Sequence, residues 1–231
     1  MAAQLRGQRA PAFRPAVVHS RRSKVHSKTK SASHRGLFAL GNGAIIPNMP
    51  VAPIFERVFK KLYGRPCWGV TNWYGSGIHL EFGEPHLEIR EPRKVGPKAT
   101  RQVRKHFARR QVFVHGEWHL CFDVCDWQIF QRGKRVGTSR SRSDLQRIVD
   151  SLNGQKLIRF SMRSRKDCVF EFDLGGVLVT QGVDPQEDQW TLFEPSGYCL
   201  TLRGDNRYSY HRSNRPLDAI SWKAIFSRTK P

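Results

Sequence analysis

The stretch HGEWHLCFDVC, residues 115–125, holds the residues best suited to bind a metal ion. His115, His119, Cys121 and Cys125 are separated by even numbers of residues, so in an extended strand they share one face. Neighbours on one face of a strand lie about 6–7 Å apart at their Cα atoms, and one transition-metal ion can bridge that separation. These four residues are therefore candidate metal ligands.

The same stretch has a simpler interpretation as an amphipathic strand. Trp118, Leu120, Phe122 and Val124 alternate with the candidate ligands and would face a hydrophobic core. The stretch has no Cys-x-x-Cys pair and no second pair of ligands, which structural zinc sites usually have. We therefore favour the simpler interpretation and predict no cofactor.

Catalytic patterns are weak. Glu81 and Glu171 occupy matching places in two similar stretches, and a pair of carboxylates could perform acid–base chemistry, but both also fit the polar face of a strand. The cysteines have no glycine elbow or oxyanion signature beside them, and DLGGVL lacks the spacing and the lysine of a phosphate-binding loop. We predict no catalytic residue and leave open whether the protein is an enzyme.

The net charge of +21 is concentrated in two segments. Residues 1–55 hold nine Lys and Arg, residues 93–110 hold eight, and neither segment contains an acidic residue. Such segments can bind nucleic acid through counterion release, although solvated loops carry the same pattern. A helix in 93–110 would bring five candidate nucleic-acid contacts mostly to one side: Arg101, Arg104, Lys105, Arg109 and Arg110.

Trp73 and Tyr74 lie beside Gly75 and Gly77, as in an exposed aromatic turn. Such rings can stack on bases, and equally they can anchor a loop on its own sheet. We keep both interpretations.

Residues 1–48 are rich in Arg, Ser, Ala and Pro and lack apolar periodicity, so we expect a disordered basic extension. It could be a transit peptide, a basic arm for nucleic acid, or a stretch upstream of a true start at Met49. No apolar run is long enough to span a bilayer, so we predict no membrane partner. Five scattered cysteines do not form a disulfide framework, and we predict a cytoplasmic protein.

The elements that must position these residues occur twice. IFERVFKKL (54–62) and LQRIVDSLNG (145–154) both predict an amphipathic helix ending at glycine, and strand-like stretches follow each. The two segments align without gaps at an offset of 90 residues as far as 89 and 179. LEF-turn-HLEI (80–89) would then be the central hairpin of a repeated unit.

The correspondence resumes at an offset of 72, where EWHLCFDV (117–124) matches QWTLFEPS (189–196). The first copy thus contains 18 extra residues, the length of the basic segment 93–110, which we interpret as an insertion. We predict one compact α+β domain over 49–231, with a duplicated unit of one helix and several antiparallel strands related by a pseudo-two-fold axis. Its parts are repeat one (54–139), repeat two (144–210) and a C-terminal segment (211–231).

Four motifs support a resemblance: FGEPHLEIREP, GEWHLCFDVCDWQI, LNGQKL and FEFDLGG. They resemble an uncharacterised family of small bacterial proteins, over roughly residues 60–210. The resemblance implies a cytoplasmic bacterial domain and supplies no catalytic residue. Our first functional hypothesis is a non-catalytic module that binds an unknown protein partner. The second is a nucleic-acid-binding protein that uses 93–110 and the N-terminal extension, and the third is an enzyme.

Overall fold

The computed structural model describes residues 51–73, 75–142, 144–164 and 167–226. The helices are α1 (Pro53–Phe59), α2 (Arg101–Phe107), α3 (Leu145–Asp150) and the short 3-10 helix η1 (Leu217–Ala219). The strands are β1 (Cys67–Trp73), β2 (Gly77–Phe82), β3 (His86–Arg90), β4 (Gln111–His115), β5 (Trp118–Phe122), β6 (Cys125–Gln131), β7 (Lys134–Thr138), β8 (Leu157–Met162), β9 (Asp167–Phe172), β10 (Gly176–Gly182), β11 (Asp188–Phe193), β12 (Tyr198–Arg203), β13 (Arg207–Arg212) and β14 (Lys223–Ala224). The predicted extension 1–48 and Met49 lie outside the described residues.

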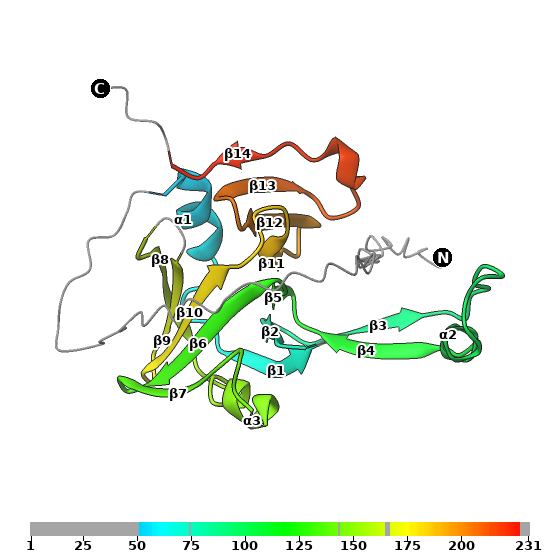
Figure 1. Cartoon of the computed structure of the whole chain (residues 1–231), viewed down its shortest axis with the longest axis horizontal. Helices are drawn as coiled ribbons and strands as arrows, with labels where there is room; N and C mark the ends of the chain where they lie inside the picture. The colour runs from blue at the N-terminus through cyan, green and yellow to red at the C-terminus, as the bar shows by residue number, and fades with distance from the viewer. Residues whose placement is uncertain (1–50, 74, 143, 165–166, 227–231) are drawn as a thin grey trace, which may run out of the picture. The chain divides into compact units, whose positions relative to one another are not determined.

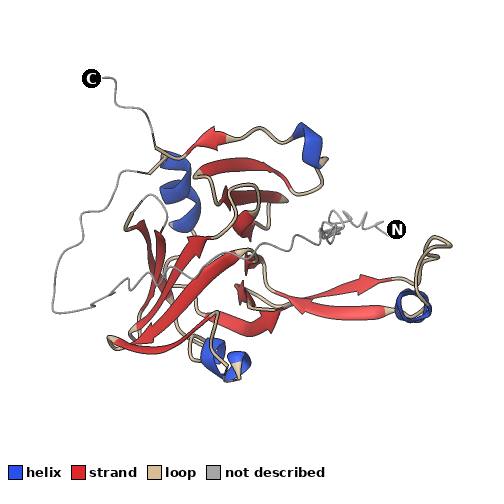
Figure 2. Cartoon of the chain, viewed as in Figure 1, coloured by secondary structure: helices blue, strands red, loops and turns tan. Residues whose placement is uncertain are grey.

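Strands far outnumber helices, and nearly all of them belong to two sheets (Figures 1 and 2). The larger sheet has the order β1-β2-β5-β11-β12-β13-β14, and the smaller has the order β7-β6-β10-β9-β8. Every strand pair among the described residues is antiparallel. The prediction of antiparallel sheets accompanied by a few helices is confirmed.

The larger hydrophobic core of the described residues lies between the two sheets. Leu120 and Phe122 of β5 and Ile129 of β6 are almost completely buried in it. The rings of Phe122 and Phe170, one from each sheet, lie 5.1 Å apart in an edge-to-face arrangement. The predicted alternation is therefore confirmed for Trp118, Leu120 and Phe122, which face the core, but not for Val124, which lies in the turn before β6 and is only partly buried.

The two predicted helices cover the core in a crossed arrangement. α1 begins at Pro53, buries Phe55, Val58 and Phe59, and stacks Phe59 on Phe160 of β8 at 4.3 Å. α3 packs against β1, where the Gln146 side chain donates to the Val70 carbonyl at 2.9 Å. Each helix thus packs on the strand that follows the other helix.

The glycines that end the two helical segments make reciprocal hydrogen bonds. Gly64 N–H donates to the Leu157 carbonyl, Gly154 N–H donates to the Cys67 carbonyl, and both distances are 2.8 Å. Both glycines have a positive φ, 83° and 82°, which a residue with a side chain rarely adopts. In each bond the residues of one copy correspond to those of the other at the predicted offset of 90.

The predicted central hairpin is present in only one copy. β9 and β10 pair with each other, but β2 pairs with β1 and β5, and β3 pairs with β4. The prediction that residues 80–89 form a hairpin is therefore wrong. The physical reason is that β4 competes for β3, and the extra residues of the first copy connect these two strands. A duplication of the whole unit with a pseudo-two-fold axis stays a prediction.

Candidate functional site

The strands β3 and β4 form a two-stranded arm that joins neither of the larger sheets. Their register pairs His86 with His115 and Arg90 with Gln111. Figure 1 shows the two strands running out from the sheets, with α2 at their far end. We call residues 86–115 the arm, and the predicted insertion 93–110 forms most of its outer part.

One face of the arm is aliphatic and open to solvent. Leu87 pairs with Val114, and Ile89 pairs with Val112 across the two strands. All four side chains are more than half exposed, although residues of this kind usually face a core. At the tip, α2 buries none of its residues. The arm therefore contributes little to the hydrophobic core of the domain.

The basic residues predicted to contact nucleic acid all lie at the outer end of the arm. Thr100 caps the N-terminus of α2, with its hydroxyl accepting from the Val103 N–H at 3.3 Å. Arg101, Arg104 and Lys105 lie on this helix, whereas Arg109 and Arg110 follow its end at Phe107. A helix, one of the two forms considered for this segment, is therefore present, but it holds three of the five cations.

Some of these cations are engaged by the arm itself. Arg110 forms an ion pair with Glu91 at 3.0 Å, and the Arg104 guanidinium donates to the Ala99 carbonyl at 3.0 Å. Arg93 lies over the Phe107 ring, 4.3 Å from its centre. Besides these, five cations of the arm form no ion pair, side-chain hydrogen bond or ring contact with any described residue: Lys94, Lys98, Arg101, Lys105 and Arg109. Their charge is directed to solvent.

A shallow hollow of about 300 Å³ opens beside α2. Its lining carries hydrogen-bond donors and positive charge, from Gln102, Lys105, His106, Arg109, Arg110 and Gln111. No carboxylate belongs to this lining. The hollow is therefore suited to a phosphate or another anion rather than to a cation.

Trp73 is half exposed at the end of β1, and its ring stacks on His79 at 5.3 Å. This contact gives the ring a partner within its own sheet, as the loop-anchor interpretation requires. Tyr74 lies outside the described residues.

At the base of the arm, the larger sheet carries a polar face on the side opposite the core. β2 contributes His79 and Glu81 to it, and the neighbouring strand β5 contributes His119 and Cys121. We call these four residues the polar face. Two of the four predicted ligands, His119 and Cys121, therefore share one face as expected.

Glu81 is buried and organises the polar face. Its Oε1 lies 2.6 Å from His119 Nδ1 and 3.1 Å from His115 Nδ1, and its Oε2 accepts from the Gly116 N–H at 2.9 Å. A carboxylate only accepts, so both ring nitrogens donate to it. His115, the last residue of β4, also places its Nε2 3.2 Å from Glu88.

Burial and hydrogen bonding shift the pKa of Glu81 in opposite directions. Burial disfavours an ionised Glu81, but the hydrogen bonds from His115 and His119 outweigh it and hold the pKa at about 2. The bond to Glu81 raises the pKa of His115. Burial lowers the pKa of His79 to about 4, so that ring is neutral at neutral pH.

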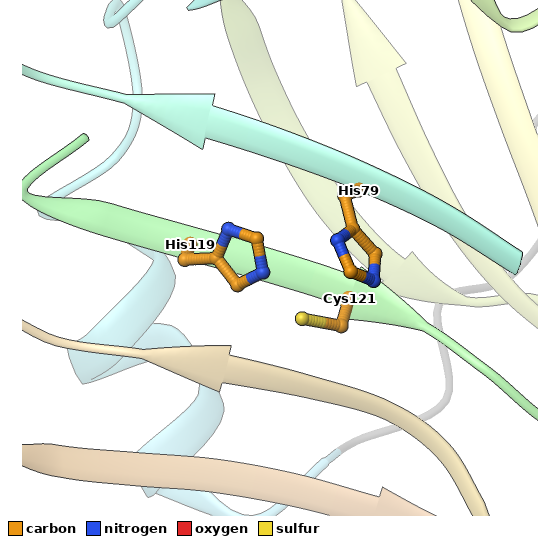
Figure 3. Close-up of side chains that lie close together, drawn as sticks. All are labelled: His79, His119 and Cys121. Atoms are coloured by element: carbon orange, nitrogen blue, oxygen red, sulfur yellow. The ribbon is translucent and has the colours of Figure 1, made fainter. Parts of the chain in front are cut away.

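Two overlapping groups of potential ligands result. The side-chain ligand atoms of His79, His119 and Cys121 lie within 4.8 Å of one another, and Figure 3 shows these three residues on two adjacent strands. Glu81, His115 and His119 form a second group within the same limit. Cys125 belongs to neither group, because it begins β6 in the smaller sheet and is buried in the core.

Sequence reasoning missed His79, although a signal for it exists. In GIHLEF, His79 and Glu81 alternate with apolar residues, as His119 and Cys121 do in WHLCF. The polar sides of the two strands lie together only because β2 pairs with β5. The suggested pair of carboxylates has no shared site, since Glu171 lies in the smaller sheet and binds Arg159 at 2.6 Å.

No family model, no curated protein and no solved structure matches this chain. The resemblance to small bacterial proteins therefore stays a prediction. None of the helices in the described ranges combines the length and apolar composition that crossing a bilayer would require.

Proposed function

We propose that this chain is a binding protein whose arm contacts the phosphate backbone of nucleic acid. The observation that carries the proposal is the set of five arm cations whose side chains have no ion pair, hydrogen bond or ring contact among the described residues, gathered around α2 and the adjoining turns. Cations that are not paired within the protein release counterions from nucleic acid at the least cost.

The form of the arm supports the same proposal. A two-stranded antiparallel ribbon or a short helix fits the major groove of duplex DNA, and the arm presents both. Its outer hollow, lined by Lys105, Arg109 and Arg110, offers donors to phosphate oxygens. The exposed aliphatic face can contact thymine methyl groups or base edges.

A salt-dependent binding assay on the full chain tests this proposal. Short duplex DNA and single-stranded RNA are titrated with protein by fluorescence anisotropy, from low to physiological salt. The test variant replaces Lys94, Lys98, Arg101, Lys105 and Arg109 with Ser. Its matched control removes the same number of exposed cations from the rest of the molecule: Lys60, Lys134, Arg135, Arg142 and Lys223.

We expect the arm variant to lose about tenfold or more in affinity and to show a shallower salt dependence, by about 0.9 per lost phosphate contact. The control should stay close to the wild type. Equal losses in the two variants would mean that net charge, and not the arm, drives binding. A wild type that binds neither nucleic acid at low salt would overturn the proposal.

The exposed aliphatic face favours a second candidate function, which is binding to a protein partner. Leu87, Ile89, Val112 and Val114 form a continuous apolar strip, as protein interfaces often do. This candidate gains support if the wild type fails to bind nucleic acid. It corresponds to an interaction module in a cytoplasmic bacterial protein, the setting that the resemblance implies.

We further propose that the domain arose by duplication. The reciprocal bonds of Gly64 and Gly154, and the crossed packing of α1 and α3, support this history. The arm would then be the principal addition to the first copy. Superposition of α1 and β1–β2 on α3 and β8–β9 tests the idea, and a different hand in the two copies would refute it.

A further inference from the structure

We propose that His79, His119 and Cys121 bind a transition-metal ion of the class of Zn²⁺, at a site independent of the arm's cations. The pairing of β2 with β5 sets the relative positions of the three side chains. β2 and β5 place His79 directly opposite Cys121, and His119 lies two residues before Cys121 on the same face. Their ligand atoms already lie within 4.8 Å of one another (Figure 3). Small side-chain rotations would bring all three within coordination distance of one ion.

The ligand types restrict the class of ion. Two imidazoles and one thiolate suit Zn²⁺, Co²⁺ or copper, whereas Mg²⁺ and Ca²⁺ prefer sets of oxygen ligands. Three protein ligands leave a fourth position for water or another small ligand. When a divalent ion binds, the Cys121 thiol loses its proton to solvent and the thiolate sulfur forms the bond to the metal.

The neighbouring carboxylate prepares His119 for this role. Glu81 Oε1 lies 2.6 Å from His119 Nδ1, which keeps the proton on Nδ1 and makes Nε2 the coordinating nitrogen. Glu81 is fixed in turn by the Gly116 N–H and by His115. Carboxylates that accept from a ligand histidine in this way orient the ring and raise its basicity.

Accessibility also suits an ion that enters from solvent. Cys121 is buried, but His79 and His119 are each partly exposed, and the half-exposed Trp73 ring stacks on His79. A cluster closed on every side would admit no ion without local unfolding. Here both imidazoles reach solvent and lie beside the buried thiol.

The second group, Glu81 with His115 and His119, is the competing site. Oε1 of Glu81 already accepts hydrogen bonds from both histidines, and both bonds would be lost if Glu81, His115 and His119 coordinated an ion through these atoms. The polar face therefore favours the group that contains His79. His115 distinguishes the two groups, because it is a ligand only in the second.

The test uses the reduced full chain after chelator treatment, without nucleic acid. Co²⁺ is titrated first, because a thiolate ligand produces an intense near-ultraviolet charge-transfer band, and Zn²⁺ is then added in competition. The variants are Cys121→Ser, His79→Gln and His115→Ala. Cys199→Ser is the matched control, since Cys199 is also buried and its Sγ already lies 3.3 Å from His211 Nε2. Circular dichroism reports whether each variant folds.

We expect Cys121→Ser to lose the charge-transfer band. His79→Gln should lower Zn²⁺ affinity by more than about 100-fold, because changes outside the ligand shell alone cost about 10- to 100-fold. His115→Ala should stay within about 100-fold of the wild type, and Cys199→Ser should be unchanged. If Cys121→Ser does not fold, the folded His79→Gln variant decides.

Bound Co²⁺ should also quench the fluorescence of Trp73, and Trp73→Phe should reduce the quenching without changing Zn²⁺ affinity. The proposal is overturned if the wild type shows no thiolate band with Co²⁺. It is equally overturned if His79→Gln binds as tightly as the wild type, or if only His115→Ala loses the ion. Each outcome is independent of whether the arm binds nucleic acid.

Discussion

The arm and the polar face at its base place charged side chains in opposite surroundings. In the arm, Lys94 and Lys105 extend into solvent without an ion-pair partner among the described residues. On the polar face, Glu81 is 5% exposed, and its two oxygens together accept three hydrogen bonds. A charge in the arm costs the fold almost nothing, whereas a charge on the polar face exists only because its surroundings compensate it.

The residues of the two regions are therefore constrained by different requirements. The unpaired cations of the arm, such as Lys94 and Lys105, satisfy no contact that the fold requires, so their charge is available to a partner. Residues of the polar face must satisfy folding first, and any ligand uses what folding has already positioned. The same substitution should therefore have different consequences in the two regions.

The largest expected difference concerns glycine. A Cβ on Gly116, at the base of the arm, would collide with the backbone oxygen of Phe82 and lie 2.8 Å from its nitrogen. Backbone atoms held in a sheet cannot yield, so Gly116→Ala should lower the free energy of unfolding by about 3 kcal/mol or more. Urea denaturation measures the loss.

Gly96, in the turn that precedes α2, is the matched control. A Cβ there has no neighbour within 4 Å, so Gly96→Ala should change the free energy of unfolding by less than about 1 kcal/mol. Similar losses for both variants would contradict the distinction between the arm and the rest of the molecule.

An intermediate effect on stability, which depends on pH, is expected from Asp188 in β11. Burial, with Asp123 and Glu187 nearby, raises its pKa to about 6, and Arg203 only partly opposes the shift. The native state therefore holds this proton more tightly than the unfolded chain, where the pKa is about 3.9. The resulting contribution to stability is present below about pH 4 and is lost as the pH rises to about 6.

Asp188→Asn removes a carboxylate that is unfavourable once ionised. The free energy of unfolding of the variant, relative to that of the wild type, should rise by at most about 3 kcal/mol between pH 4 and pH 7. Urea denaturation at both pH values measures the gain. The exposed Glu84, in the turn before β3, supplies the comparison, since Glu84→Gln should differ by less than about 0.5 kcal/mol. A constant difference for Asp188→Asn at all pH values would refute the assignment.

The smallest effect is expected on the aliphatic face of the arm. Val112→Thr with Val114→Thr keeps the side-chain shape and the strand propensity, and both positions are more than half exposed. The stability should change by less than about 0.5 kcal/mol. The same exchange at Val70, which is 3% exposed, buries a hydroxyl and should cost about 1–3 kcal/mol. Thermal denaturation compares them, and an equal cost would show that the arm is packed in solution.

Local patterns predicted local structure well. The apolar spacing of residues 54–62 predicted α1, and the alternation in WHLCF predicted which side chains of β5 face the core. Strand pairing was harder, because alternation shows which face of a strand is buried but not which strand lies beside it. For this reason the separation of β3 from β2 was missed, and so was the partnership of His79 with His119 and Cys121.

The same limit applies to the grouping of the candidate metal ligands. His119 and Cys121 were placed together correctly because two residues of one strand share a face whatever the fold. Cys125 was grouped with them on the assumption that the strand continues, but Asp123 and Val124 interrupt it and β6 enters the other sheet. A helix in 93–110 was considered beside a solvated loop, whereas the long ribbon that carries it required knowledge of a distant partner strand.

The crossed packing of the two helices has a consequence for biosynthesis. α1 packs on β8, α3 packs on β1, and the bonds of Gly64 and Gly154 join the two segments. As the chain leaves the ribosome, the apolar side of α1 has no lasting cover until β8 has been made. Phe55 and Phe59 therefore stay exposed until the second half of the chain has been synthesised. Such distant contacts slow folding and lengthen the period in which chaperones or neighbouring nascent chains can bind.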